Sequence, residues 1–411
     1  MSPASSIAQR AMPGAGSGET PASSPSSFIA PGATLGVLGG GQLGRMFAHA
    51  AQQSGYRVAV LDPDETSPAG TIAHEHVRTG YLDVAGLARL AEIAAALTTE
   101  FENVPAEALA TLARSRPVAP GAEAVAICQD RAAEKAAFAR AGVACAPYAV
   151  LASAADLDQG ADALLPGILK TARLGYDGRG QRRVESRADL ARAFAELGGV
   201  TCVLEQRLPL VAEISVIVAR SAAGEIVALP VQENVHRDGI LALTRVPAQA
   251  VDDDRRAEAV ALAERIAAAI GYVGVLCVEL FVLEGGTLFA NEMAPRPHNS
   301  GHYSIDACDV SQFDLQVRTM TGAPLVAPRL HSPAVMLNLL GDLWFRGGPQ
   351  APVEPPWARV LALPGAHLHL YGKRDARPGR KMGHLTLTAA SAAAADAAAR
   401  EAAAILGIAG W

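Results

Sequence analysis

Two glutamates in neighbouring apolar segments have the spacing of a metal-binding pair. The segments on either side of Gly285 and Gly286 have the composition of β-strands, and the glycines are typical of a turn. A hairpin centred between these glycines would place Glu279 directly opposite Glu292, with Cβ atoms about 4.5–5.5 Å apart. Opposed carboxylates in apolar strands repel each other and lose hydration. Mg²⁺, or alternatively Mn²⁺, would remove that cost. The alternatives are a pair at the solvent edge or one buried, protonated acid.

A glycine-rich segment follows the predicted strand that carries Lys170. It comprises Gly175, Tyr176, Asp177, Gly178, Arg179, Gly180 and Gln181. Its N–H groups and its guanidinium could wrap phosphate oxygens as a mobile flap. An ordinary Asp-Gly hairpin turn explains the same residues equally well.

Two further segments are dense in hydrogen-bond donors. Residues 296–302, just after Glu292, include Arg296, His298 and Asn299. A second cluster comprises Lys373, Arg374, Arg377, Arg380 and Lys381. In an acidic protein this cluster could hold a substrate phosphate; the alternative is an exposed basic turn.

Lysine is rare in this chain, which uses arginine for most of its basic positions. The lysines are Lys135, Lys170, Lys373 and Lys381. Lysine differs most from arginine where a compact point charge is needed, as on a phosphate. These four positions therefore rank above ordinary surface lysines as candidates for a site.

Residues 39–44 satisfy G-x-G-x-x-G between a predicted strand and a predicted helix, with Asp62 about twenty residues further on. Such a turn can bring a helix N-terminus to a phosphate. The direct interpretation is a nicotinamide or flavin dinucleotide site. The same turn could instead bind another anion, such as a small substrate or bicarbonate, or nothing.

The surrounding pattern predicts a mixed α/β and α+β fold. Residues 33–38 and 56–61 read as strands around a helix at 45–54, which indicates a doubly wound parallel sheet to about residue 128. A helix is expected at 129–141 and another at 389–406. Strands are expected at 167–171, 181–184, 200–205, 214–219, 226–231, 275–283 and 287–291. The predicted domains are 33–128, 129–325 and 326–411, after a Ser- and Pro-rich leader, 1–32, that should be disordered.

Composition excludes several classes of protein. The chain has 411 residues and a formal net charge of −6, which argues against nucleic acid as the main partner. Its apolar stretches are interrupted by charged residues, so no membrane span is expected. The 5 cysteines are scattered and form no CxxC pair, which favours the reducing cytoplasm.

Together these motifs resemble the N5-carboxyaminoimidazole ribonucleotide synthases, ATP-grasp ligases of purine biosynthesis. The resemblance runs from about residue 34 to 406. It is carried by the motifs above and by Asp130-Arg131, Glu205-Gln206, Asn291-Glu292 and the segments 100–105, 295–302 and 377–384. Ala294 departs from the wider superfamily, which often has Asn at that position, so a third protein ligand for the metal is in doubt.

The resemblance implies that bicarbonate carboxylates the exocyclic amine of 5-aminoimidazole ribonucleotide, with carboxyphosphate as intermediate and ADP and phosphate released. It implies an ATP-grasp fold with a pre-ATP-grasp N-terminal domain, and a homodimer. Another ATP-grasp carboxylase or ligase, an NAD-dependent dehydrogenase and a non-catalytic nucleotide-binding regulator remain alternatives.

The resemblance also implies roles for individual residues. ATP would be held by Arg131, Lys170, the segment 175–181, Glu205, Gln206, Arg207, Leu208, Glu213, His236, Asn291 and Glu292. Mg²⁺ would bind Glu279 and Glu292. Bicarbonate would meet Arg296, His298, Asn299 and Glu100. The ribonucleotide would contact Gly41, Gln42, Leu43, Tyr176, Asp177, Arg179, Lys373 and Arg380. Separately from the resemblance, Asp177 is the candidate base for the amine proton, with Tyr176 or His298 as alternatives for that step.

Overall fold

The computed structural model describes residues 28–158, 161–175, 180–346 and 352–409. The predicted residues Tyr176, Asp177, Gly178 and Arg179 lie outside this part of the chain, as do residues 1–27 of the leader. Residues 28–32 are held in place, because the Ile29 N–H donates to the Thr321 carbonyl (2.9 Å) and the Tyr56 hydroxyl donates to the Ile29 carbonyl (2.7 Å). The expectation of a disordered leader is therefore wrong for residues 28–32.

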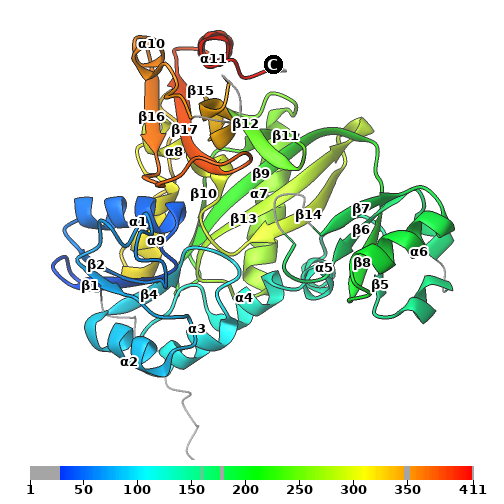
Figure 1. Cartoon of the computed structure of the whole chain (residues 1–411), viewed down its shortest axis with the longest axis horizontal. Coiled ribbons are helices and arrows are strands. Elements are labelled where there is room, and N and C mark those ends of the chain that lie inside the picture. Colours follow the sequence, from blue (N-terminus) through cyan, green and yellow to red (C-terminus); the bar gives the residue numbers. More distant parts are fainter. Residues whose placement is uncertain (1–27, 159–160, 176–179, 347–351, 410–411) are drawn as a thin grey trace, which may run out of the picture.

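The N-terminal part is the predicted doubly wound domain, with a parallel sheet in the order β3-β2-β1-β4 (Figure 1). Its strands are β1 (Thr34–Leu38), β2 (Arg57–Leu61), β3 (Glu75–Val77) and β4 (Ala96–Thr99). Its helices are α1 (Gln42–Gln53), α2 (Val84–Ile93), α3 (Ala106–Ala113) and α4 (Ala122–Cys128). Helix α1 begins earlier than residue 45, because Glu100 at the end of β4 accepts the N–H groups of Gly41 and Gly44 and so satisfies its first turn.

A small antiparallel sheet, in the order β5-β8-β6-β7, stands to one side of the molecule (Figure 1). Its strands are β5 (Tyr148–Leu151), β6 (Gly167–Thr171), β7 (Gln181–Val184) and β8 (Cys202–Gln206). It is covered by α6 (Arg187–Glu196), and α5 (Arg131–Arg140) precedes it. Asp130 caps α5 by accepting the N–H groups of Ala132 and Ala133.

The large sheet is antiparallel and runs in the order β14-β13-β9-β11-β12-β15-β17-β16, with β10 on β9. Its central strands are β9 (Leu210–Arg220), β10 (Ile226–Ala228), β11 (Gln232–Arg237), β12 (Ile240–Val246), β13 (Gly274–Leu283) and β14 (Leu288–Ala294). Its C-terminal strands are β15 (Ala334–Leu340), β16 (Ala366–Leu370) and β17 (Lys381–Thr388). The predicted domains 129–325 and 326–411 therefore share one continuous hydrogen-bonded ladder.

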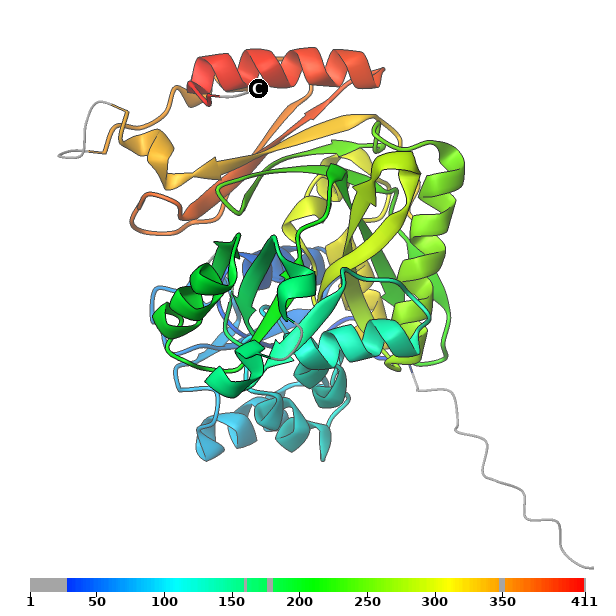
Figure 2. The ribbon, with the colours of Figure 1, turned by 90° about the vertical axis from the view of Figure 1, so that its right-hand side faces the viewer.

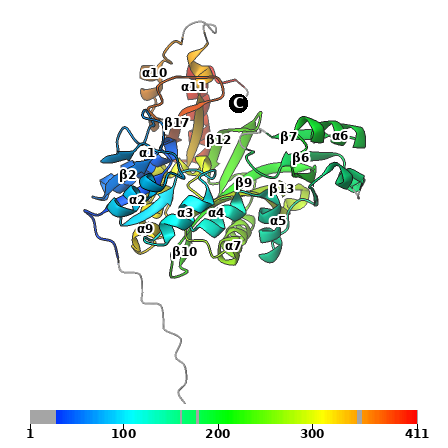
Figure 3. The ribbon, with the colours of Figure 1, turned by 60° about the horizontal axis from the view of Figure 1, so that its bottom comes forward.

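Helices cover this sheet on separate faces. They are α7 (Asp253–Ala269), α8 (Ser304–Ala307), α9 (Gln312–Thr321), α10 (Trp357–Leu361) and α11 (Ala392–Leu406). Helix α11 lies along the outside of the C-terminal strands (Figure 2), burying a stripe that includes Ala395, Ala399 and Leu406. Helix α7 covers β9 and β13 from below (Figure 3).

The N-terminal domain and the large sheet share a core. Phe313 and Val317 of α9, together with Tyr371 after β16, pack into the cluster that Phe47 of α1 and Val37 of β1 form. Burial of this apolar surface stabilises the joint between three segments that are distant in sequence. Within the described ranges, no helix has the length and apolar character needed to cross a membrane.

Candidate active site

A cavity of about 920 Å³ lies where the N-terminal domain, the small sheet and the large sheet meet. Most of the described site residues that the sequence predicts line it: Gly41, Gln42, Leu43, Glu100, Arg131, Lys170, Gly175, Gln181, Glu213, His236, Glu279, Asn291, Glu292, Arg296, His298, Asn299, Lys373 and Arg380. Among the described members of the predicted set, Gly180 and residues 205–208 lie outside its wall.

Glu279 of β13 and Glu292 of β14 are directly paired across the hairpin, as predicted. The ladder nearer the turn is offset, however, with Phe281 opposite Phe289 and Leu280 opposite Ala290. A β-bulge leaves Asn291 as an extra residue and brings Glu292 into register with Glu279. The predicted pairing is thus correct, but it depends on a bulge that a regular hairpin centred on the two glycines would not have.

Helix α5 holds this bulge from behind. The fully buried Lys135 ammonium donates to the Asn291 carbonyl (2.9 Å), and the Met293 N–H donates to the Glu134 carboxylate (2.6 Å). The peptide groups on both sides of Glu292 are therefore fixed by one helix. Neither residue was assigned to the site from sequence; the rarity of lysine was the only signal that pointed to Lys135.

The two paired carboxylates lie in different electrostatic surroundings. Glu292 reaches Arg131 at 3.0 Å, and although burial raises its pKa, Arg131 and Lys170 hold that pKa below the usual value. Burial and the neighbouring Glu292 raise the pKa of Glu279. Glu279 is therefore the member of the pair whose negative charge lacks compensation.

His298 contacts Glu279 from the segment after β14. Its Nδ1 accepts the Ser300 N–H (3.4 Å), so the proton is on Nε2, which donates to the Glu279 carboxylate (3.2 Å). Burial, with Arg296 and Lys381 nearby, lowers the pKa of His298 well below its usual value. The ring is neutral at physiological pH and orients Glu279 without neutralising it.

Lys170 extends from the small sheet towards the same strands. It lies 2.9 Å from Glu205 of β8 and 3.5 Å from the Asn291 side-chain oxygen. Glu205 is buried and also reaches Lys135 (3.3 Å). The two lysines hold the pKa of Glu205 below its usual value despite burial. Glu205 therefore anchors Lys170 from behind the cavity wall.

Glu213 of β9 and His236 of β11 form a second polar pair in the wall, with Oε2 and Nδ1 2.6 Å apart. Burial lowers the pKa of His236, but the hydrogen bond to Glu213 and the charges of Glu279 and Glu292 raise it above the usual value. Strands β11 and β12 were not predicted from sequence. Their turn, Asp238-Gly239, has φ of 51° and 78°, which is the Asp-Gly hairpin signal.

The glycine-rich turn at 39–44 is already bonded to carboxylates. Besides the two bonds to Glu100 (3.1 Å each), the Gly40 N–H donates to Asp62 at 2.7 Å. Burial raises the pKa of Glu100. These three donors are therefore already bonded within the protein, and the binding of an anionic substrate or bicarbonate at this helix N-terminus stays a prediction. Glu100 caps the helix and does not present a free carboxylate.

Arg296 and Asn299 lie on the wall next to this capped turn. Arg296 forms an ion pair with Glu102. Burial alone would lower the pKa of Arg296, but the negative charge of Glu102 raises it above the usual value. Asn299 is buried, and both polar atoms of its side chain lack a hydrogen-bond partner among the described residues. An unpartnered buried amide is costly, which is typical of a group that binds a ligand.

The C-terminal strands bring part of the basic cluster to the opposite wall. Lys373 donates to the Gln42 side chain and to the Lys381 carbonyl, both at 2.6 Å. Arg380 bonds the Asp375 carbonyl (2.7 Å). Lys373, Arg380 and Lys381 line the cavity, whereas the described side chains of Arg374 and Arg377 do not.

Three domain families match the chain in order. They are the ribonucleotide synthetase preATP-grasp domain at 32–129, the ATP-grasp domain at 136–313 and the phosphoribosylaminoimidazole carboxylase C-terminal domain at 334–398. The N5-carboxyaminoimidazole ribonucleotide synthase of Bacillus subtilis is 43% identical over 360 residues, 87% of this chain and 92% of that protein. The Brucella melitensis enzyme of the same name is 43% identical over 361 residues, 87% of this chain and 97% of that protein.

Solved structures agree with these matches over most of the chain. N5-carboxyaminoimidazole synthetase from Staphylococcus aureus, complexed with ADP, superposes with a TM-score of 0.84 at 38% identity, covering 92% of this chain and 98% of that one. The Aspergillus clavatus enzyme, in complex with ADP and 5-aminoimidazole ribonucleotide, has a TM-score of 0.83 at 32% identity, covering 91% and 98%. This chain belongs to the N5-carboxyaminoimidazole ribonucleotide synthase family of ATP-grasp ligases.

Proposed function

We propose that the chain carboxylates the exocyclic amine of 5-aminoimidazole ribonucleotide, using ATP and bicarbonate. A bicarbonate oxygen attacks the γ-phosphorus, the bond to the β-phosphate oxygen breaks, and ADP leaves. The amine nitrogen then attacks the carboxyl carbon of carboxyphosphate, phosphate leaves and the amine loses a proton. The observation that carries this proposal is a single cavity with paired carboxylates on one wall and Lys373 and Arg380 on another.

ATP binding is assigned to the side of the cavity between the two sheets. Lys170 and Arg131 supply fixed positive charges for its phosphates. Glu213 and His236 supply polar groups, and Asn291 faces Lys170. Glu205 supports Lys170, and residues 206–208 and 175–181 complete the proposed ATP site.

The paired carboxylates fit a hard divalent cation. Glu279 and Glu292 offer opposed oxygens, and burial together with the charge of Glu292 raises the pKa of Glu279. We assign Mg²⁺, or Mn²⁺, to these two residues. When bound, the ion would neutralise charge on the phosphates during transfer. His298 and Arg131 orient the two carboxylates for that role.

Bicarbonate is assigned to Arg296, His298 and Asn299. Arg296 offers a positive charge, and the unpartnered Asn299 amide offers a donor and an acceptor in the same wall. Such groups can hold a small anion at the attacking distance, which is how binding lowers the barrier. Glu100 shapes this wall by capping α1, so its contribution is structural.

The ribonucleotide is assigned to the opposite wall. Lys373 and Arg380 supply the cations for its phosphate, with Gln42, Gly41 and Leu43 beside them. Tyr176, Asp177 and Arg179 complete this set as proposals, with Asp177 as the base for the amine proton.

We also propose three domains, with the bounds 33–128, 129–325 and 326–411. We further propose that the protein is a homodimer, which light scattering on the purified chain tests.

Phosphate release tests the reaction. Bicarbonate and 5-aminoimidazole ribonucleotide are each left out in turn from a reaction of the purified chain with ATP and Mg²⁺. Phosphate should be released only when both are present. Mass spectrometry should show a product heavier by one carboxyl group, labelled when ¹³C-bicarbonate is used. Release without the ribonucleotide-derived product, or an unlabelled product, would contradict the proposal and favour another ATP-grasp ligase.

A further inference from the structure

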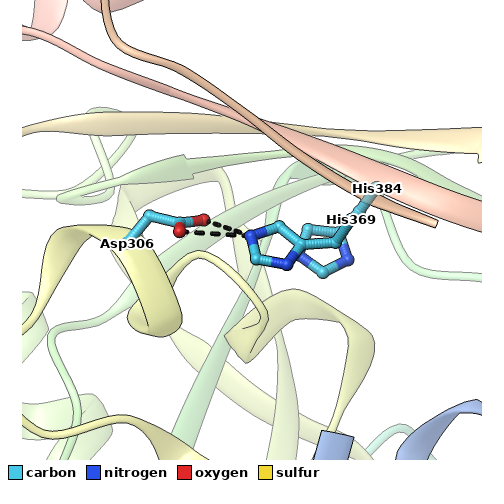
Figure 4. A group of neighbouring side chains, drawn as sticks. All are labelled: Asp306, His369 and His384. Atoms are coloured by element: carbon cyan, nitrogen blue, oxygen red, sulfur yellow. Dashed lines mark hydrogen bonds and ion pairs between the residues drawn. The ribbon is translucent and has the colours of Figure 1, made fainter. Parts of the chain in front are cut away.

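A cluster of histidines and one aspartate lies outside the cavity, where α8 meets the C-terminal strands (Figure 4). Asp306 of α8, His369 of β16 and His384 of β17 each offer one ligand atom, and these atoms lie within 4.8 Å of one another. None of these three described residues lines the ATP cavity. The cluster is therefore separate from the site proposed for the reaction.

The antiparallel ladder forces the two histidines together. His369 and His384 are directly paired between β16 and β17, so their side chains project from the same face of the sheet. Their rings stack with centroids 4.4 Å apart and planes 13° apart. Figure 4 shows the Asp306 carboxylate approaching this stack from α8, with its oxygens 2.9 and 3.1 Å from His369 Nε2.

His384 has one bonded and one unpartnered nitrogen. Its Nδ1 lies 3.0 Å from the Tyr371 hydroxyl, while its Nε2 is buried and has no hydrogen-bond partner within the described chain. With Nδ1–H donating to the Tyr371 oxygen, this is the arrangement of a metal-binding histidine, because the outer hydrogen bond leaves the other nitrogen free to ligate. A buried nitrogen without a partner is otherwise costly.

The charges of the cluster also suit a cation. Asp306 is the acid, with only 10% of its side chain exposed, and it has His369 and His367 beside it (2.9 and 3.7 Å). His367 and His369 are 40% and 30% exposed, which leaves a path from solvent.

We propose that Asp306, His369 and His384 bind a divalent transition-metal ion such as Zn²⁺. Two imidazoles and one carboxylate are a nitrogen-rich ligand set that favours Zn²⁺ or Co²⁺ over Mg²⁺. The ion would join α8 to β16 and β17, and so would brace the segment that carries Lys373 to the rest of the molecule.

Binding of Zn²⁺ alone to the untagged full chain tests this site. The chain is stripped with EDTA, dialysed into excess Mg²⁺ to compete at the glutamate pair, and titrated calorimetrically with Zn²⁺. Wild type should bind one Zn²⁺ per chain, and Co²⁺ should give the visible absorption bands of a low-coordinate nitrogen and oxygen site. His369→Gln and Asp306→Asn should each weaken Zn²⁺ binding at least tenfold.

Controls separate this site from others. His74→Gln, in the N-terminal domain, and Glu279→Gln, in the cavity, should leave the stoichiometry and affinity unchanged. Thermal melts in EDTA establish that each variant is folded, and added Zn²⁺ should raise the melting temperature of wild type but not of His369→Gln. Equal Zn²⁺ affinity in wild type and both cluster variants, or no Zn²⁺ bound by wild type, would overturn the proposal.

Discussion

The two sides of the cavity hold their charges in different ways. On the side of the paired carboxylates, charged groups are held by partners from other elements, as Glu205 is by Lys135 and Lys170. On the side of the basic cluster, Lys373 donates to the Gln42 side chain and to the Lys381 carbonyl, and Arg380 bonds an exposed backbone carbonyl. Substitutions on the first side should therefore affect folding or chemistry, whereas those on the second should affect binding alone.

The largest effect is expected at the paired carboxylates. Glu279→Gln or Glu292→Gln should lower kcat on the order of 10³-fold or more, because charge neutralisation during phosphoryl transfer is lost. Without metal the variants should melt no lower than wild type, because like-charge repulsion is relieved. Steady-state kinetics and thermal melts measure both. Glu284→Gln, in the turn of the same hairpin, is the matched control; near-normal turnover at limiting Mg²⁺ would refute the metal pair.

Lys135→Met should reduce both stability and turnover. It leaves Glu205 with one cationic partner and the Asn291 carbonyl without its donor, so unfolding free energy should fall by about 2–3 kcal/mol. Urea denaturation measures this loss, and kcat should fall because the bulge is released. Arg140→Met, exposed on the same helix, should change neither. An unchanged kcat in a destabilised Lys135→Met would show that α5 supports the fold only.

On the opposite side, Lys373→Ala should raise the KM for the ribonucleotide about ten- to a hundredfold, with a smaller rise for Arg380→Ala. A lost charge-assisted contact to phosphate costs about 1.5–3 kcal/mol. The KM for ATP should hardly change. Arg377→Ala, outside the cavity wall, is the control. A similar loss for ATP would remove the distinction between the two sides.

The smallest effect is expected at the capped glycine turn. Glu100→Gln should lower the unfolding free energy by about 1 kcal/mol, because one of two backbone N–H groups loses its acceptor. The KM for bicarbonate should stay within about twofold. A large rise in that KM with unchanged stability would instead place Glu100 in contact with bicarbonate.

Local patterns were sufficient to predict several elements closely. Strands β6 and β7 have the predicted bounds, and the pairing of Glu279 with Glu292 is confirmed. The bulge at Asn291 could not be predicted from the hairpin, because it is held by Lys135 and Glu134 from another helix. The Asp238-Gly239 dipeptide, by contrast, is typical of a hairpin turn and could have predicted strands β11 and β12.

Other features depend on long-range contacts that the sequence pattern did not predict. The G-x-G-x-x-G turn looks like an anion site when read alone, but Glu100 and Asp62 arrive from other strands and take its donors. The contact of Asp306 with His369 likewise joins residues far apart in sequence. Such partners are brought together only by the tertiary fold, so spacing along the chain does not show them.

The continuous large sheet has a mechanical consequence. Glu292 lies on its edge strand β14, and the basic segment connects β16, the other edge strand, to β17. Both segments thus belong to one hydrogen-bonded sheet, and both reach the same cavity. The small sheet with Lys170 is a separate ladder, so it can shift against the large sheet without breaking strand pairs within either sheet. A shift of the small sheet would therefore move Lys170 relative to Glu279 and Glu292, while the strand pairs that join these glutamates to the C-terminal strands stay intact.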